Sequence, residues 1–261
     1  MERADSSEPS GPALQVDLVL RAFEDGVAAI GRMAVAFGIP EEWDARTPCP
    51  EWRARDLAGH LRCIADDYHE YLDDAPASRY ARLLGSGPDP QALARKLARQ
   101  NAAELAALPD APPDEHLAAF ILAARAYARR LPSVWDLPHH QYRDVVVTVA
   151  GMAGAATAEW HLHAWDLARA LGTDHRPADP EAVLAGWRAG MTHLPATING
   201  SVPGRPAPRR PAARRPAARR PATVTSAAGP VPVPSYAVPR RSHRGDDPWH
   251  ILLRASGRQP A

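Results

Sequence analysis

Apolar side chains recur at helical spacing over most of the first 195 residues, and this periodicity restricts the chain to a helical fold. Strand-forming residues are scarce outside Val145–Val149, and alanine dominates the 45% of residues that are apolar. Within 14–37 the helical spacing is formed by Leu14, Leu18, Ala22, Val27, Ile30, Met33 and Phe37. We therefore predict an all-α fold.

Prolines and a glycine separate the expected helices. Pro40 ends the first helix, Pro132 bounds a weaker one, and Gly172 is a suitable helix C-terminal residue because glycine tolerates positive φ. The helices are expected at about 14–37, 53–72, 90–108, 115–130, 145–171 and 181–193. His139 and His140 precede a possible strand.

The sequence changes character after Pro195. Residues 1–204 carry 19 Arg and Lys against 28 Asp and Glu, whereas residues 205–261 carry 12 against 2. Arg-Arg-Pro-Ala-Ala recurs in Gly204–Thr223, a composition that cannot bury a core. We expect a disordered N-terminus over 1–13, a helical bundle over 14–195, a Pro/Arg-rich linker over 196–245 and a short C-terminal element over 246–261, in which Trp249–Leu253 could dock on the bundle.

The remaining composition favours a cytoplasmic protein. Met1–Pro12 lacks a basic segment followed by an apolar one, and no apolar run reaches the ~18 residues of a membrane span. Cys49 and Cys63 are too few for a disulfide framework. We expect no membrane association.

A possible metal-binding pair lies in Glu159-Trp-His-Leu-His163. Residues four apart on a helix lie about 40° apart on one face, so Glu159 and His163 converge, whereas His161 points nearly opposite. Asp166 lies one turn further along the same face. By spacing alone, an exposed helical Glu–His pair is the favoured interpretation of these residues.

A third candidate is His60, on the helix that follows the proline-rich turn at 47–52. By spacing alone, His60 reads as a core histidine. Cys63 could reach a metal but reads as a buried thiol, and Cys49, between two prolines, reads as structural. Only the packing of the two helices against each other would bring His60 to Glu159 and His163.

Two motifs resemble one known family. Thr47-Pro-Cys-Pro-Glu-Trp52, with Asp56, Leu57 and His60 after it, resembles the N-terminal motif of the mycothiol-dependent maleylpyruvate isomerase family, whose members have DinB-like folds. Glu159 and His163-Ala-Trp-Asp-Leu-Ala-Arg-Ala-Leu-Gly172 resemble its second motif. The resemblance covers roughly 14–195, and Pro248–Arg258 resembles the tail of a related subgroup.

The resemblance implies a DinB-like four-helix bundle with a metal held between its helices. It implies His60, Glu159 and His163 as ligands of a divalent ion, with zinc expected. Asp56 and Asp166 fit partners that orient imidazoles and fit ordinary surface carboxylates equally well. The open position would receive the thiol of mycothiol, which loses its proton on the metal and attacks a small electrophilic substrate. The implied activity is that of an isomerase or thiol transferase.

The sequence departs from the family pattern in two places. Arg53 stands where a Ser or Thr usually caps the helix, which leaves the start of that helix open. The Arg/Pro tract has no counterpart in the family pattern.

Two other functions compete with a thiol-using enzyme. One is a metal-binding sensor or scaffold without turnover. The other is nucleic-acid binding through the seven arginines between Arg205 and Arg220. The tract lacks aromatic residues that would stack on bases, so its composition favours a solvated linker.

Overall fold

The computed structural model describes residues 14–49, 52–73, 90–142, 145–191 and 245–260. The N-terminal segment 1–13 and nearly all of the Pro/Arg-rich segment 196–245 therefore lie outside the described residues. Four long helices form the body of the molecule: α1 (Val16–Ala36), α2 (Ala54–Asp73), α5 (Pro113–Val134) and α6 (Val149–Ala170).

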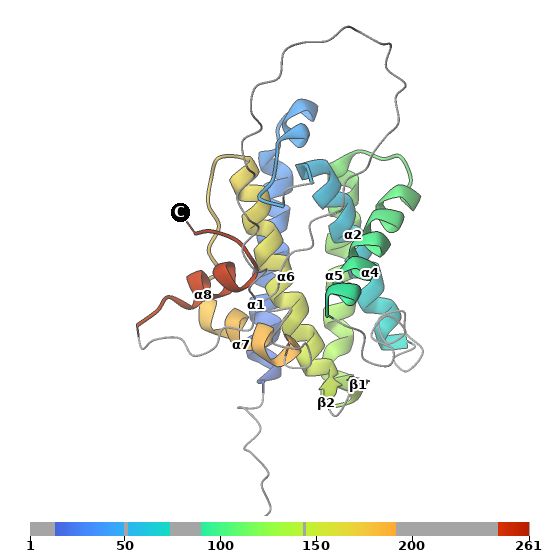
Figure 1. The fold of residues 1–261 in the computed structure, drawn as a ribbon, viewed down its shortest axis with the longest axis vertical. Coiled ribbons are helices and arrows are strands. Elements are labelled where there is room, and N and C mark those ends of the chain that lie inside the picture. Colours follow the sequence, from blue (N-terminus) through green and yellow to red (C-terminus); the bar gives the residue numbers. More distant parts are fainter. Residues whose placement is uncertain (1–13, 50–51, 74–89, 143–144, 192–244, 261) are drawn as a thin grey trace, which may run out of the picture.

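These helices form a four-helix bundle in which α1 packs on α6 and α5, and α2 packs on α5 and α6 (Figure 1). The expectation of an all-α fold is confirmed, with one small addition. The strands β1 (Pro138–Tyr142) and β2 (Val145–Thr148) form an antiparallel pair at one end of the bundle.

Shorter elements cover the bundle. A 3₁₀ turn, η1 (Pro40–Asp44), joins α1 to the loop before α2, and α4 (Pro90–Ala107) packs on α2. On the other side, α7 (Pro180–Met191) packs on α6, and α8 (Pro248–Ala255) packs on α7 (Figure 1).

Helix α6 is the central element, and its composition explains why. It is built largely of Ala and Gly, which allow α1 and α7 to approach closely, and most of its residues are buried. The Thr148 hydroxyl caps its first turn by accepting the N–H of Gly151, and Gly172 follows its end at a φ of 71°. A residue on α6 is thus held by neighbours on several sides.

The core has two parts that meet along α6. The larger lies inside the bundle and includes Phe23, Leu57, Phe120 and Trp160. The smaller lies between α6, α7 and α8 and includes Trp165, Trp187, Trp249 and Leu252. The apolar segment Trp249–Leu253 is therefore packed against the body of the protein.

Candidate metal centre

The first motif folds into a closed turn that fixes the start of α2. Both the N–H and the hydroxyl of Thr47 donate to the carbonyl of Trp52, at 3.2 and 2.8 Å. Arg53 does not cap the helix with its side chain; instead its own N–H donates to the carboxylate of Asp56 at 2.9 Å. Asp56 therefore stabilises the helix start, and the indole of Trp52 lies over the ring of His60, with 4.3 Å between centroids.

Helix α6 holds His163 in a defined orientation. Its Nδ1 lies 3.0 Å from Oδ2 of Asp166, one turn further along. Because an ionised carboxylate can only accept, Nδ1 is the ring nitrogen that donates, and Nε2 is the ring nitrogen that this bond does not use. Asp166 therefore orients this imidazole.

The packing of α2 on α6 brings His60 to His163. The two rings lie 5.3 Å apart between centroids and are perpendicular. His60 is only 6% exposed, and its Nδ1 has no hydrogen-bond partner among the described residues. Burial, and secondarily His163, hold the pKa of His60 well below its usual value, so that this ring is neutral at neutral pH.

Glu159 lies one turn before His163 on the same face of α6. Its Oε2 accepts a hydrogen bond of 3.0 Å from the hydroxyl of Tyr68 on α2. Burial raises the pKa of Glu159, while the nearby His163 and the Tyr68 hydroxyl oppose that rise. Glu159, His60 and His163 thus all belong to the contact between α2 and α6, but among the described residues they do not form a group whose ligand atoms lie within 4.8 Å of one another.

A second group of possible ligands shares His163. Cys49, His163 and Asp166 offer ligand atoms that all lie within 4.8 Å of one another. The Cys49 thiol donates to Oδ2 of Asp166 at 3.4 Å. Burial, and then the charge of Asp166, raise the pKa of this thiol to about 12, so it keeps its proton at neutral pH.

Arg258 already supplies a cation to this second group. Its Nε donates to Oδ1 of Asp166 at 2.8 Å, and its Nη2 donates to Oδ2, in a pair that is buried on both sides. Burial alone would raise the pKa of Asp166, but Arg258 and His163 hold it well below the usual range. Asp166 is therefore ionised and compensated by a fixed guanidinium.

Sequence reasoning did not assign Cys49, Arg258 or Tyr68 to the site. Arg258 lies 92 residues beyond Asp166, and no periodicity links the two positions. Its only signal was the resemblance of Pro248–Arg258 to a family tail. Cys49 was placed in the motif but read as structural.

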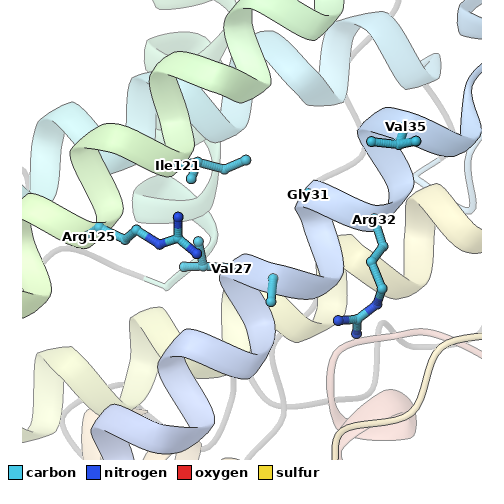
Figure 2. A pocket seen from close by; sticks show the side chains of 7 residues that line it. Val27, Gly31, Arg32, Val35, Ile121 and Arg125 are labelled. Atoms are coloured by element: carbon cyan, nitrogen blue, oxygen red, sulfur yellow. The ribbon is translucent and has the colours of Figure 1, made fainter.

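A surface groove between α1 and α5 is separate from this centre. It is lined by small and aliphatic residues together with two arginines, Arg32 and Arg125 (Figure 2). Arg125 donates to the carboxylate of Glu24. With no imidazole, thiol or carboxylate among its lining residues, the groove offers a metal ion nothing to bind.

A family model described as the mycothiol maleylpyruvate isomerase N-terminal domain matches residues 23–168. The match includes His60, Glu159, His163 and Asp166 and stops before Arg258. The comparisons with curated proteins and with solved structures gave no match. Within the described part of the chain, no helix has an apolar stretch long enough to cross a bilayer.

Proposed function

The chain belongs to the mycothiol maleylpyruvate isomerase N-terminal domain family, and from this membership and the site we propose that it binds one divalent ion through His60, Glu159 and His163. With the ion bound, the protein would use the thiol of mycothiol as a cosubstrate in an isomerisation or thiol transfer on a small electrophilic molecule. Two imidazoles and one carboxylate form a ligand set found in catalytic zinc sites, which makes zinc the expected ion.

The pairing of His60 with His163 is the observation that supports this proposal most strongly. Two buried imidazoles from different helices face each other, and His60 has a buried nitrogen without a partner. Leaving a buried polar atom unsatisfied costs about 1–3 kcal/mol. A cation bound at that nitrogen would remove the penalty, so the residues present fit a metal ion.

The competing set of Cys49, His163 and Asp166 fits an ion less well. Arg258 already neutralises Asp166, and a second cation beside a fixed guanidinium would be repelled. The thiol of Cys49 would also have to give up its proton against a raised pKa. These two facts favour His60 and Glu159 as the partners of His163.

A bound divalent ion would lower the pKa of a coordinated thiol, which makes the thiolate available near neutral pH. The residues of this chain support that chemistry in specific ways. Asp166 orients the ring of His163 by accepting from its Nδ1, and Trp52 packs against the ring of His60. Cys49 and Cys63 form no disulfide with each other, which suits a reducing cytoplasm.

Elemental analysis of purified variants tests the ligand set. We expect about one zinc per chain in the unmodified protein and in Cys49→Ser, and nearly none in His60→Ala or His163→Ala. His163→Ala affects both candidate sets, so His60→Ala and Cys49→Ser are the pair that separates them. If Cys49→Ser loses the metal and His60→Ala keeps it, the other set holds the ion.

A sensor or scaffold that binds metal without turnover would give the same metal content. Mycothiol distinguishes the two functions, because only a thiol-using enzyme needs an open position for it. Isothermal titration should show mycothiol binding to the zinc form but not to the metal-free form, with release of about one proton per thiol. Absence of binding to the zinc form would favour the sensor or scaffold.

A further inference from the structure

Tyr68 makes a direct contact with one of the three proposed ligands. It lies on α2 two turns after His60, and its hydroxyl donates to Oε2 of Glu159 at 3.0 Å. The side chain is almost fully buried, at 5% exposure. The contact crosses the same α2–α6 interface in which the two histidines meet.

The ring of Tyr68 is fixed from several sides. Tyr71, Tyr127 and Trp160 lie 5.7, 5.4 and 5.6 Å from it between centroids, from α2, α5 and α6 in turn. Buried aromatic pairs of this kind favour defined edge-to-face orientations. The phenol cannot turn away from Glu159 without displacing this cluster, so the position of its hydroxyl is set by the core.

The hydroxyl restricts the carboxylate that it contacts. By engaging Oε2, it fixes the plane of the carboxylate on a side chain that has three rotatable bonds. A carboxylate already held in one orientation loses less conformational freedom when it binds a metal ion.

We propose that Tyr68 is a positioning residue that holds Glu159 ready to bind the divalent ion. The inference rests on the proposed function, because it assigns a role toward the same ion. Hydrogen-bond partners of metal ligands typically contribute about 10–100-fold to metal affinity. The contrasting role for Tyr68 is purely structural, a hydrogen bond that joins α2 to α6.

The test uses the full-length protein and its Tyr68→Phe variant, stripped of metal and reloaded. Zinc affinity is measured by competition with a chelator, and we expect about a 10–100-fold loss. Tyr127→Phe is the matched control, because it removes the same atom from a buried ring next to Tyr68 whose hydroxyl does not bond to Glu159. Its affinity should stay within about 3-fold of the unmodified protein.

The visible spectrum of the Co²⁺ forms gives a readout that a structural role would not change. At saturation, the Tyr68→Phe spectrum should differ from that of the unmodified protein, because Glu159 binds the ion in a different orientation. The Tyr127→Phe spectrum should not differ. Tyr68→His retains a ring with an N–H donor, so it should recover part of the zinc affinity. If Tyr68→Phe does not fold, Tyr68→His is measured in its place.

A double-mutant cycle shows whether Tyr68 acts through Glu159. In a Glu159→Ala background, Tyr68→Phe should change the Ni²⁺ affinity by less than about 2-fold, because the acceptor of the Tyr68 hydrogen bond is gone. Ni²⁺ is used in this background because it binds the two remaining imidazoles well. The inference on Tyr68 is overturned if Tyr68→Phe lowers metal affinity equally with Glu159 present and with Glu159→Ala. It is also overturned if the Tyr68→Phe protein keeps both its metal affinity and its Co²⁺ spectrum. Failure of the unmodified protein to bind any of these ions overturns the proposed function instead.

Discussion

At the scale of single residues, a sequence pattern links some side chains of the candidate centre, whereas only tertiary packing brings the others to it. Glu159 and His163 could be predicted because their spacing puts them on one helical face, and the match to a known motif added His60. Arg258 and Tyr68 could not be predicted, because only tertiary packing brings them to Asp166 and Glu159. The contact of Cys49 with Asp166 could not be predicted, because a cysteine between two prolines shows no partner in the sequence.

The pair of Asp166 and Arg258 predicts a large effect of a small change. Asp166→Asn keeps the size of the side chain but leaves Arg258 buried without its counter-charge. Removing one partner of a buried ion pair costs about 3 kcal/mol or more, so we expect a loss of that size in the free energy of unfolding of the metal-free protein.

Urea denaturation measures that loss, and Glu24→Gln is its control. Glu24 pairs with Arg125 at an exposed position, where solvent screens the interaction. Glu24→Gln should leave the unfolding midpoint nearly unchanged. If both variants lower the free energy of unfolding by the same small amount, Asp166 and Arg258 do not form a buried ion pair.

At the scale of elements, periodicity located the helices well and their ends less well. The expected helix at 145–171 begins at Val149, because residues 145–148 pair with β1 as a strand. The expected end before Pro132 was also wrong, since α5 continues to Val134. A proline in the last turn removes one hydrogen bond, and the burial of Leu131 and Trp135 compensates for it.

The contact between α6 and α7 requires glycine at specific positions. A Cβ added at Gly154 would lie 2.6 Å from the Cα and carbonyl oxygen of Gly186, which is backbone that cannot move aside. We therefore expect Gly154→Ala to destabilise the protein by about 2 kcal/mol, measured as a loss in the free energy of unfolding.

Gly31→Ala in α1 is the matched control for that substitution. Its new Cβ would meet only the side-chain tip of Ile121, at 3.4 Å. Alanine is a better helix former than glycine by up to about 1 kcal/mol, so this variant should be neutral or slightly stabilising. If both substitutions stabilise the protein, α6 and α7 do not pack as closely as described.

At the scale of the whole molecule, the centre depends on parts of the chain far apart in sequence. The family match ends at residue 168, yet Arg258 reaches Asp166 from the segment after α8. Docking of α8 positions that segment: Trp249 packs edge-on against His161 and His175 and donates its N–H to the carbonyl of His175. His161, which points away from the proposed ligands as its spacing predicted, accepts from Nε2 of His175 and donates to the carbonyl of Ala22 on α1. The candidate metal centre and the contact that docks α8 thus lie on two sides of α6.

X-ray absorption at the zinc edge tests the central claim most directly, because it reports the ligands of the ion in the intact protein. We predict that zinc in the protein alone has only nitrogen and oxygen neighbours, at about 2.0–2.2 Å. Addition of mycothiol should introduce one sulfur neighbour at about 2.3 Å. A sulfur neighbour before mycothiol is added would place Cys49 on the metal. The absence of a sulfur neighbour after mycothiol is added would show that the ion does not bind the thiol. Either result would contradict the account.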